Sequence, residues 1–135
     1  MNDIQYLQAA VTVGNEVAAP YNFGAVVVSD GKIIASEHAY VFESNDPSAH
    51  AEISAIRSAA AEICDYKIPG ATLYASHEPC TMCLMCASWA GIQRIVYATP
   101  ASASDATMYD LAAPDITHMA SILREPIRVE HVSLS

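Results

Sequence analysis

Basic side chains are scarce in this 135-residue chain. Six lysines and arginines stand against fifteen acidic residues, which gives a formal net charge of −9, and the six are scattered without forming a basic run. Proteins that bind nucleic acids gain much of their affinity from lysine and arginine side chains that neutralise phosphates. The charge balance therefore argues against a nucleic-acid partner and favours a small, largely uncharged substrate.

The sequence also lacks a continuous apolar stretch of the roughly 20 residues that a bilayer-spanning helix requires. Its first ten residues contain Asp3, Gln5 and Gln8 and no basic residue, a composition that is not typical of a signal peptide. Of the four cysteines, three fall within seven residues, whereas a secreted disulfide framework spreads its cysteines to close larger loops. We therefore expect no membrane association, a cytoplasmic location and cysteines that bind a metal.

The composition is that of a folded domain. Apolar residues make up 53% of the chain and charged residues 16%, which excludes a disordered protein. A length of 135 residues is sufficient for one domain with a buried core. With no internal repeat or linker in the sequence, residues 1–135 are expected to form a single domain.

Apolar periodicity and turn residues predict strands that alternate with helices. Spacing near the helical period predicts helices over 1–19, from Asp46-Pro47 to about Cys64, and from Glu78-Pro79 to about Gly91, with shorter helical turns over 106–113 and 115–123. Short β-branched segments predict five strands, at 24–29, 32–36, 71–75, 94–99 and 127–132, and residues 41–46 are expected to be a polar loop. An opening hairpin followed by alternating strands and helices predicts an α/β fold, a three-layer α/β/α sandwich.

Two short segments carry candidate metal ligands. Cys80 and Cys83 are three residues apart and therefore lie on one face of a helix. With the imidazole of His50 they make a set of three ligands suited to zinc, and a catalytic zinc site keeps its fourth position for water. Both helices are expected to begin at the proline just before these ligands, so that their N-terminal dipoles favour thiolates.

Glu52 is the predicted catalytic residue. It follows His50 by two residues, a spacing that places two side chains on different faces of a regular helix. The two side chains converge only near a helix end, where Pro47 is expected to place them. This favours Glu52 as a general acid and base that moves protons between water and substrate, over a role as a fourth metal ligand.

A purely structural zinc site is the alternative interpretation of these motifs. Such a site requires four protein ligands, and Cys86 or His77 is the available fourth ligand. Cys86 lies six residues past Cys80, about 240° further around a helix, and is expected to point elsewhere. The spacing therefore favours a catalytic zinc site with three protein ligands.

Three segments of the chain match a known pattern: residues 23–28 (FGAVVV), 45–52 (NDPSAHAE) and 78–83 (EPCTMC). The His-x-Glu and Pro-Cys-x-x-Cys signature is that of the zinc deaminases. The chain resembles the cytidine-deaminase-like superfamily, and within it the branch that holds bacterial guanine deaminases and tRNA adenosine deaminases. The resemblance implies a five-stranded mixed sheet between helices, a Zn²⁺ cofactor and a homodimer.

The resemblance also implies substrate contacts. Phe23 and Ala51 lie in the matching segments, and the backbone around Ala51 is expected to hold the reacting oxygen. Trp89 matches an aromatic position of guanine deaminases, with core packing as its alternative role. Asp105 falls in a segment similar to the stretch whose carboxylate reads the purine edge, with helix capping or solvent exposure as the alternative. At Ala39, eleven residues before His50, this branch usually has an asparagine that bonds the ring or sugar.

The resulting prediction is a hydrolytic deaminase that releases ammonia from a nucleobase-like heterocycle, such as the purine guanine. The alanine at position 39 alters the pocket wall and leaves another purine, a pterin or a triazine-like ring open as the substrate. One alternative is a tRNA adenosine deaminase, which needs a positive surface for its RNA. Another is a non-catalytic, zinc-folded subunit that scaffolds a partner, for which a carboxylate at Glu52 has no use.

Overall fold

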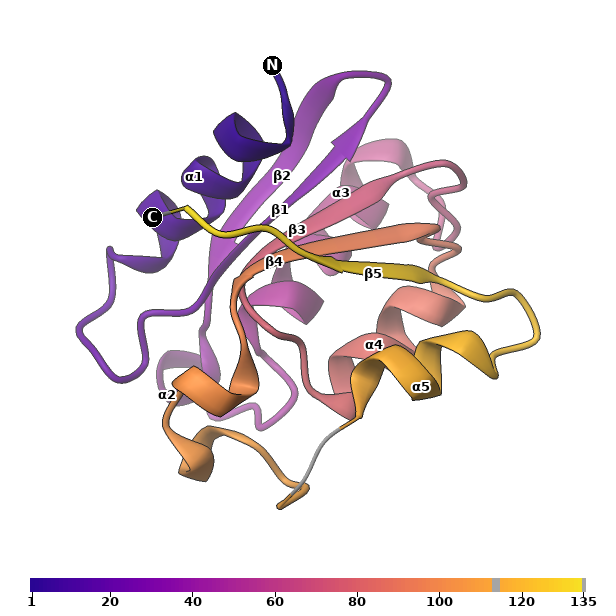
Figure 1. Ribbon diagram of the computed structural model, residues 1–135. Coiled ribbons are helices and arrows are strands. Elements are labelled where there is room, and N and C mark those ends of the chain that lie inside the picture. Colours follow the sequence, from indigo (N-terminus) through magenta and orange to yellow (C-terminus); the bar gives the residue numbers. More distant parts are fainter. Residues whose placement is uncertain (113–114, 135) are drawn as a thin grey trace.

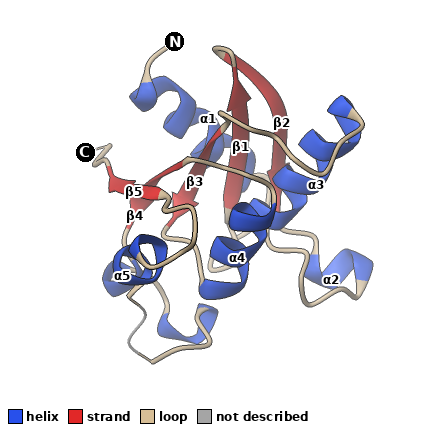
Figure 2. Cartoon of the chain, turned by 90° about the vertical axis from the view of Figure 1, so that its right-hand side faces the viewer, coloured by secondary structure: helices blue, strands red, loops and turns tan. Residues whose placement is uncertain are grey.

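The computed structural model describes residues 1–112 and 115–134, and it contains a five-stranded sheet with helices on both faces (Figures 1 and 2). The strands are β1 (Gly24–Ser29), β2 (Lys32–His38), β3 (Thr72–His77), β4 (Arg94–Thr99) and β5 (Arg128–His131). The helices are α1 (Asp3–Gly14), α2 (Val41–Ser44), α3 (Ala51–Ile63), α4 (Thr81–Trp89) and α5 (Ile116–Ser121), with 3-10 turns η1 (Ala101–Ala103) and η2 (Ala106–Met108). The three-layer α/β/α sandwich predicted from the sequence is confirmed.

The sheet is mixed, in the order β2-β1-β3-β4-β5. β1 pairs antiparallel with β2 and β3, whereas β3, β4 and β5 are parallel. The hairpin between β1 and β2 turns at Asp30 and Gly31, whose φ angles of 51° and 73° suit the Asp-Gly turn that the sequence predicts.

The two faces of the sheet bury two separate cores. Ala25 and Val27 of β1 point toward α3, α4 and α5, where they join the larger core, whose members include Leu73, Leu84 and Ile95. Val26 and Val28 alternate with them and pack on the other face, against Tyr6, Leu7 and Ala10 of α1. This alternation is the period of two that a strand imposes, and it fixes the register of β1.

Two predicted boundaries at the N-terminal side are corrected. α1 ends at Gly14, with Asn15 as its C-cap, rather than continuing to residue 19. The backbone of Gly14 lies directly against β1, where a Cβ atom would be 2.7 Å from the Gly24 nitrogen. Residues 41–46, expected to be a loop, contain the single-turn helix α2, which ends at Asn45 in the left-handed region (φ 51°). The end of the turn predicted at 106–113 lies outside the described residues. Within the described part of the chain, no helix is both long and apolar enough to cross a membrane.

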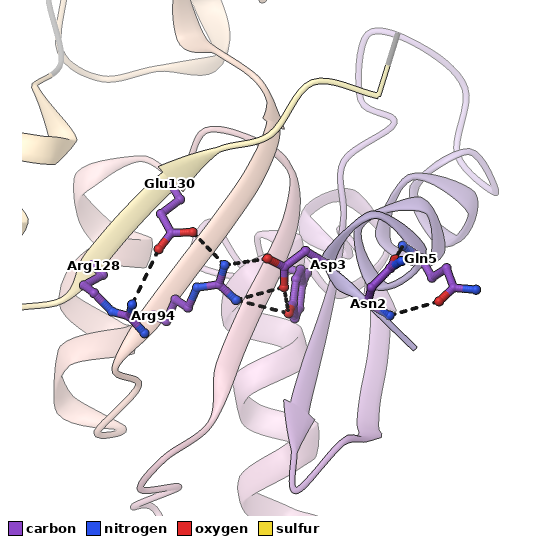
Figure 3. A network of polar contacts seen from close by, with 7 residues as sticks. Asn2, Asp3, Gln5, Arg94, Arg128 and Glu130 are labelled. Carbon is purple, nitrogen blue, oxygen red and sulfur yellow. Dashed lines mark hydrogen bonds and ion pairs between the residues drawn. The ribbon is translucent and has the colours of Figure 1, made fainter.

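An ion-pair network ties α1 to the sheet (Figure 3). Arg94 of β4 donates to both carboxylate oxygens of Asp3 at 2.8 and 2.6 Å and to Glu130 of β5 at 2.6 Å, and the Tyr74 hydroxyl donates to Asp3 at 2.6 Å. These hydrogen bonds, first of all that from Arg94, lower the pKa of the Asp3 carboxyl to about 2, and Arg94 likewise lowers the pKa of Glu130. The network therefore holds the first helix by charges that depend on ionised carboxylates.

Asp3→Asn is expected to lower the free energy of unfolding at pH 7 by about 1 kcal/mol, a discounted value because the Asp3 side chain is 38% exposed and screened by solvent. A carboxyl whose pKa is depressed in the folded state contributes stability above its unfolded pKa, and that contribution is lost as the pH falls through the folded pKa. The difference in free energy of unfolding between wild type and Asp3→Asn should therefore shrink as the pH falls from 5 toward about 2. Urea unfolding across this range measures it, with Glu62→Gln on the exposed face of α3 as the control; equal stabilities of wild type and Asp3→Asn at pH 7 would contradict the account.

Candidate zinc centre and pocket

Three side-chain atoms from two helix ends converge on one point. The Nδ1 atom of His50 lies 3.5 Å from the Sγ atoms of both Cys80 and Cys83, and the two sulfurs are 3.5 Å apart. Zn–S bonds of about 2.3 Å and Zn–N bonds of about 2.0–2.1 Å in a tetrahedron place such ligand atoms roughly 3.5–3.8 Å apart. The donor set and its spacing therefore fit zinc, and among the described residues no fourth protein ligand joins this cluster.

The ligands occupy the caps of α3 and α4. His50 and Cys80 are the N-cap residues of the two helices, both with extended backbone, and Cys83 is the third residue of α4. N-cap and third-residue side chains face each other at a helix start, which explains why the Cys-x-x-Cys spacing brings the two sulfurs together. The hydrogen bond between the thiols is the largest cause of a Cys80 pKa lowered to about 4, so Cys80 is disposed to bind a cation as the thiolate.

The predicted starts of these two helices, at Asp46-Pro47 and Glu78-Pro79, are wrong by a few residues. Asp46 does not cap α3; its Oδ1 atom accepts from the Ser48 amide at 2.9 Å and from the Ser48 hydroxyl at 2.7 Å, and so closes a local turn. The helix then begins only at Ala51. The shift places the ligands at the caps instead of inside the first turn, and leaves the ligand set unchanged.

Glu52 lies beside the cluster and is buried, with 3% of its surface exposed. It is the second residue of α3, so the helix end brings it and His50 to the same pocket, as predicted. Burial is the main cause that raises the pKa of its carboxyl to about 7. A buried carboxyl poised near neutrality can both accept and donate a proton.

A pocket of about 270 Å³ opens over the cluster. His50, Glu52 and Cys80 line it together with three of the predicted substrate contacts, Phe23, Ala39 and Ala51. Its other walls are largely apolar or aromatic and also carry carboxylates: Val17, Tyr21, Val41, Phe42, Glu43, Glu78, Thr107, Met108, Tyr109 and Asp110. No lysine or arginine occurs among these described lining residues, so the pocket is suited to a neutral, largely flat molecule that can donate hydrogen bonds.

The structure does not bring Trp89 or Asp105 to this pocket. Trp89 is the last residue of α4 and 75% exposed, because the helix turns Cys83, Leu84 and Ala87 inward and leaves its final residue facing solvent. It is neither a pocket residue of this chain nor part of its core. Asp105 caps η2 by accepting from the Thr107 amide at 2.9 Å, which is the capping role that the sequence left open for it.

Two residues of the segment after β4, Tyr109 and Asp110, line the pocket although the sequence gives neither of them a site role. Tyr109 packs on the cluster of Ile53, Cys80 and Cys83, and its hydroxyl donates to the Glu78 carbonyl at 2.7 Å. Asp110, the next residue, lines the pocket, and its charge contributes to the raised pKa of His50, of which the hydrogen bond with Cys80 is the largest cause. In the segment after β4, the carboxylate that lines the pocket is that of Asp110 and not that of Asp105.

Comparison with known proteins identifies a family, and the relatives found include two kinds of deaminase. Residues 1–99 match the sequence model of the cytidine and deoxycytidylate deaminase zinc-binding region. Guanine deaminase of Bacillus subtilis is 44% identical over 103 residues, which cover 73% of this chain and 65% of that protein. A tRNA-specific adenosine deaminase of Agrobacterium fabrum is 47% identical over 74 residues, which cover 55% of this chain and 49% of that protein. The chain thus matches about two thirds and about half of the length of these relatives.

Solved structures of both kinds of deaminase superpose on this chain. A structure from a study of A-to-I editing by tRNA:A34 deaminases superposes with a TM-score of 0.78 at 29% identity, covering 94% of this chain and 91% of that one. The X-ray structure of guanine deaminase from Bacillus subtilis superposes with a TM-score of 0.72 at 38% identity, covering 94% and 84%.

Proposed function

Because the chain belongs to the family of the cytidine and deoxycytidylate deaminase zinc-binding region, we propose that it hydrolyses the exocyclic amino group of a purine such as guanine and releases ammonia. The observation that carries the proposal is the placement of buried Glu52 beside the His50, Cys80 and Cys83 cluster, in a pocket whose described lining residues include no lysine or arginine. A non-catalytic zinc-folded subunit does not require a buried carboxylate there.

Different groups of the chain would bind the metal, transfer protons and stabilise the developing charge in this reaction. His50, Cys80 and Cys83 would hold the zinc, which when bound acts as a Lewis acid and makes water a nucleophile at neutral pH. Glu52 accepts the proton of the attacking water and passes it to the ring nitrogen, and a second transfer to the amino group lets ammonia leave. Free backbone N–H groups at the starts of α3 and α4, around Ala51 and Cys80, stabilise the oxygen that forms on the ring carbon.

A free base fits the pocket better than a nucleotide does. Glu43 and Asp110 offer carboxylate acceptors to ring and amino N–H groups, whereas the Glu78 carboxylate already accepts from the Ala101 amide at 3.1 Å. A phosphate would meet these charges with no lysine or arginine among the described lining residues. The similarity to a guanine deaminase supports guanine in particular. We extend the proposal to a homodimer in the cytoplasm, a compartment that keeps the zinc-binding cysteines reduced.

The second candidate is a tRNA adenosine deaminase, which the relative in Agrobacterium fabrum and the tRNA:A34 deaminase structure favour. The net charge of −9 and the acidic pocket oppose it. Ammonia release from guanine, adenine, 2,6-diaminopurine, a pterin and a triazine, run in parallel with inosine formation in tRNA, separates the candidates. We expect turnover of a free base and no inosine; inosine formation without free-base turnover would establish the second candidate instead.

Ala39→Asn is expected to change kcat/KM for guanine. Ala39 lines the pocket and offers no side-chain hydrogen bond, and a buried substrate acceptor left unpaired there costs about 1–3 kcal/mol, or roughly 10- to 100-fold in discrimination. We therefore expect kcat/KM for guanine to rise by roughly tenfold and the ranking among bases to change. Ala39→Leu, whose side chain branches at the same atom as that of asparagine but has no amide, is the control and should lower kcat/KM. An unchanged ranking in Ala39→Asn would show that position 39 has no bearing on specificity.

A further inference from the structure

Phe23, one wall of the pocket, is backed by a second ring. The imidazole of His77, the last residue of β3, lies parallel to the Phe23 ring, with an interplanar angle of 5° and 4.0 Å between ring centroids. Phe23 lines the pocket, and His77 is not among the described lining residues. The histidine therefore lies behind the phenylalanine and sets the plane that the phenylalanine presents to a substrate.

The histidine is itself held from behind. The hydroxyl of Ser76, which is only 2% exposed, accepts from the Gly24 amide at 2.9 Å and lies 2.7 Å from Nδ1 of His77. Since the amide already uses an acceptor lone pair of the hydroxyl, the hydroxyl proton is free to be donated to Nδ1. That bond requires a neutral ring with its proton on Nε2, and burial lowers the pKa of His77, which favours the neutral form.

The backbone next to Phe23 is equally confined. A Cβ atom at Gly24 would collide with the Ala10 carbonyl oxygen and the Gly14 backbone, so the backbone of α1 packs directly against β1 at this point. The Gly24 amide that holds Ser76 belongs to the residue directly after Phe23. The chain of contacts from Gly24 through Ser76 and His77 thus returns to the Phe23 ring and fixes it from both its backbone and its face.

We infer that Ser76 and His77 are positioning residues, which hold the Phe23 ring in the plane that a flat heterocycle stacks against. The inference rests on the proposed function only in that the pocket receives such a ring. Neither residue belongs to the zinc cluster or contacts Glu52 in the hydrogen bonds of the described residues. Their loss should therefore weaken substrate binding and leave the chemical step intact, so that KM changes and kcat does not.

The first test does not depend on activity. The chain has only two phenylalanines, so protein labelled with 4-fluorophenylalanine gives one ¹⁹F resonance for Phe23 and one for Phe42. His77→Asn keeps an acceptor for the Ser76 hydroxyl but removes the ring, and we expect the Phe23 resonance to shift and broaden while that of Phe42 stays in place. His131→Asn, which removes the ring stacked on Tyr97 at 5.4 Å, is the matched control and should leave both resonances unchanged.

The second test is kinetic and uses guanine. His77→Asn is expected to raise KM by roughly tenfold with kcat within about twofold of wild type. His77→Phe, which restores a stacking ring, should bring KM most of the way back to the wild-type value. Ser76→Ala should also raise KM. If a substitution at His77 lowers the yield of folded protein, Ser76→Ala still tests the chain of contacts that runs through Ser76 and His77 to Phe23.

The two tests together separate the possible failures. Wild type without activity on any base would contradict the proposed function, and the ¹⁹F measurement would still decide the positioning of Phe23. A Phe23 resonance unmoved in both His77→Asn and Ser76→Ala would overturn the inference. A loss confined to kcat, with KM unchanged, would overturn it as well.

Discussion

Glu52→Gln is expected to retain zinc and the fold and to lose on the order of 10³-fold in kcat. Glutamine has nearly the same shape as glutamate but cannot accept the proton of the attacking water or return it to the ring. Only the proton transfer is removed, because Glu52 lies beside the His50, Cys80 and Cys83 cluster and is not one of the three ligands. Steady-state ammonia release, with zinc content and melting temperature measured on the same preparation, gives the result.

The matched control for this variant is Glu43→Gln, which changes another carboxylate that lines the pocket. A substitution that alters only the charge of the wall should cost less than about tenfold in kcat/KM, well below the loss expected at Glu52. Glu52→Gln with near wild-type turnover would assign the general acid and base role to another group. Loss of zinc from Glu52→Gln would instead show that the carboxylate helps to hold the metal.

Cys83→Ala is expected to lose tight zinc and, with it, activity and thermal stability. The Cys83 side chain is fully buried between Ile53 and Cys80, so no outside ligand can replace its sulfur. Changes to residues that merely orient a ligand already cost about 10–100-fold in metal affinity, and removal of the ligand itself should cost more than that. Metal analysis after dialysis against a chelator, together with the melting temperature in the presence and absence of zinc, measures the effect.

Cys86→Ala provides the control within the same helix. Cys86 is half-buried and lies outside the ligand cluster of the described residues, so its removal should leave one zinc per chain. Stoichiometric, chelator-resistant zinc in Cys83→Ala would contradict the assigned ligand set. Zinc loss in Cys86→Ala would point to the four-ligand structural site that the spacing of the motif argues against.

Much of the fold could be predicted because it follows from local patterns. The Asp30-Gly31 turn and the β-branched residues on either side of it predict the hairpin, and the alternation along β1 is what sends Val26 and Val27 to different faces. Helix starts were harder, because a proline or an aspartate favours a helix end without excluding a turn that comes before it. At Asp46 the side chain closes such a turn with Ser48, and α3 begins at Ala51, four residues after the start that the sequence predicts at Pro47.

The ligand set could likewise be predicted from the sequence, because spacing within one helix turn determines how Cys80 and Cys83 meet. The pocket walls could not, because they join residues far apart in the chain. Nothing near Phe23 in the sequence indicates that it stacks on His77. Nothing around Asp105 indicates that its carboxylate accepts a hydrogen bond within the 3-10 turn while Asp110 lines the pocket. These contacts exist only after β1 and β3 pair and the segment after β4 folds back over the zinc ligands.

The most direct test of the account is ammonia release from guanine as zinc is removed and restored. Wild-type protein stripped by a chelator under reducing conditions should lose turnover, and addition of one equivalent of zinc per chain should restore it, while Glu52→Gln takes up the same equivalent and stays inactive. This result would show that one metal held by His50, Cys80 and Cys83 works together with Glu52. Turnover that survives complete removal of zinc, or zinc-loaded wild type that releases ammonia from no base and forms no inosine in tRNA, would contradict the account.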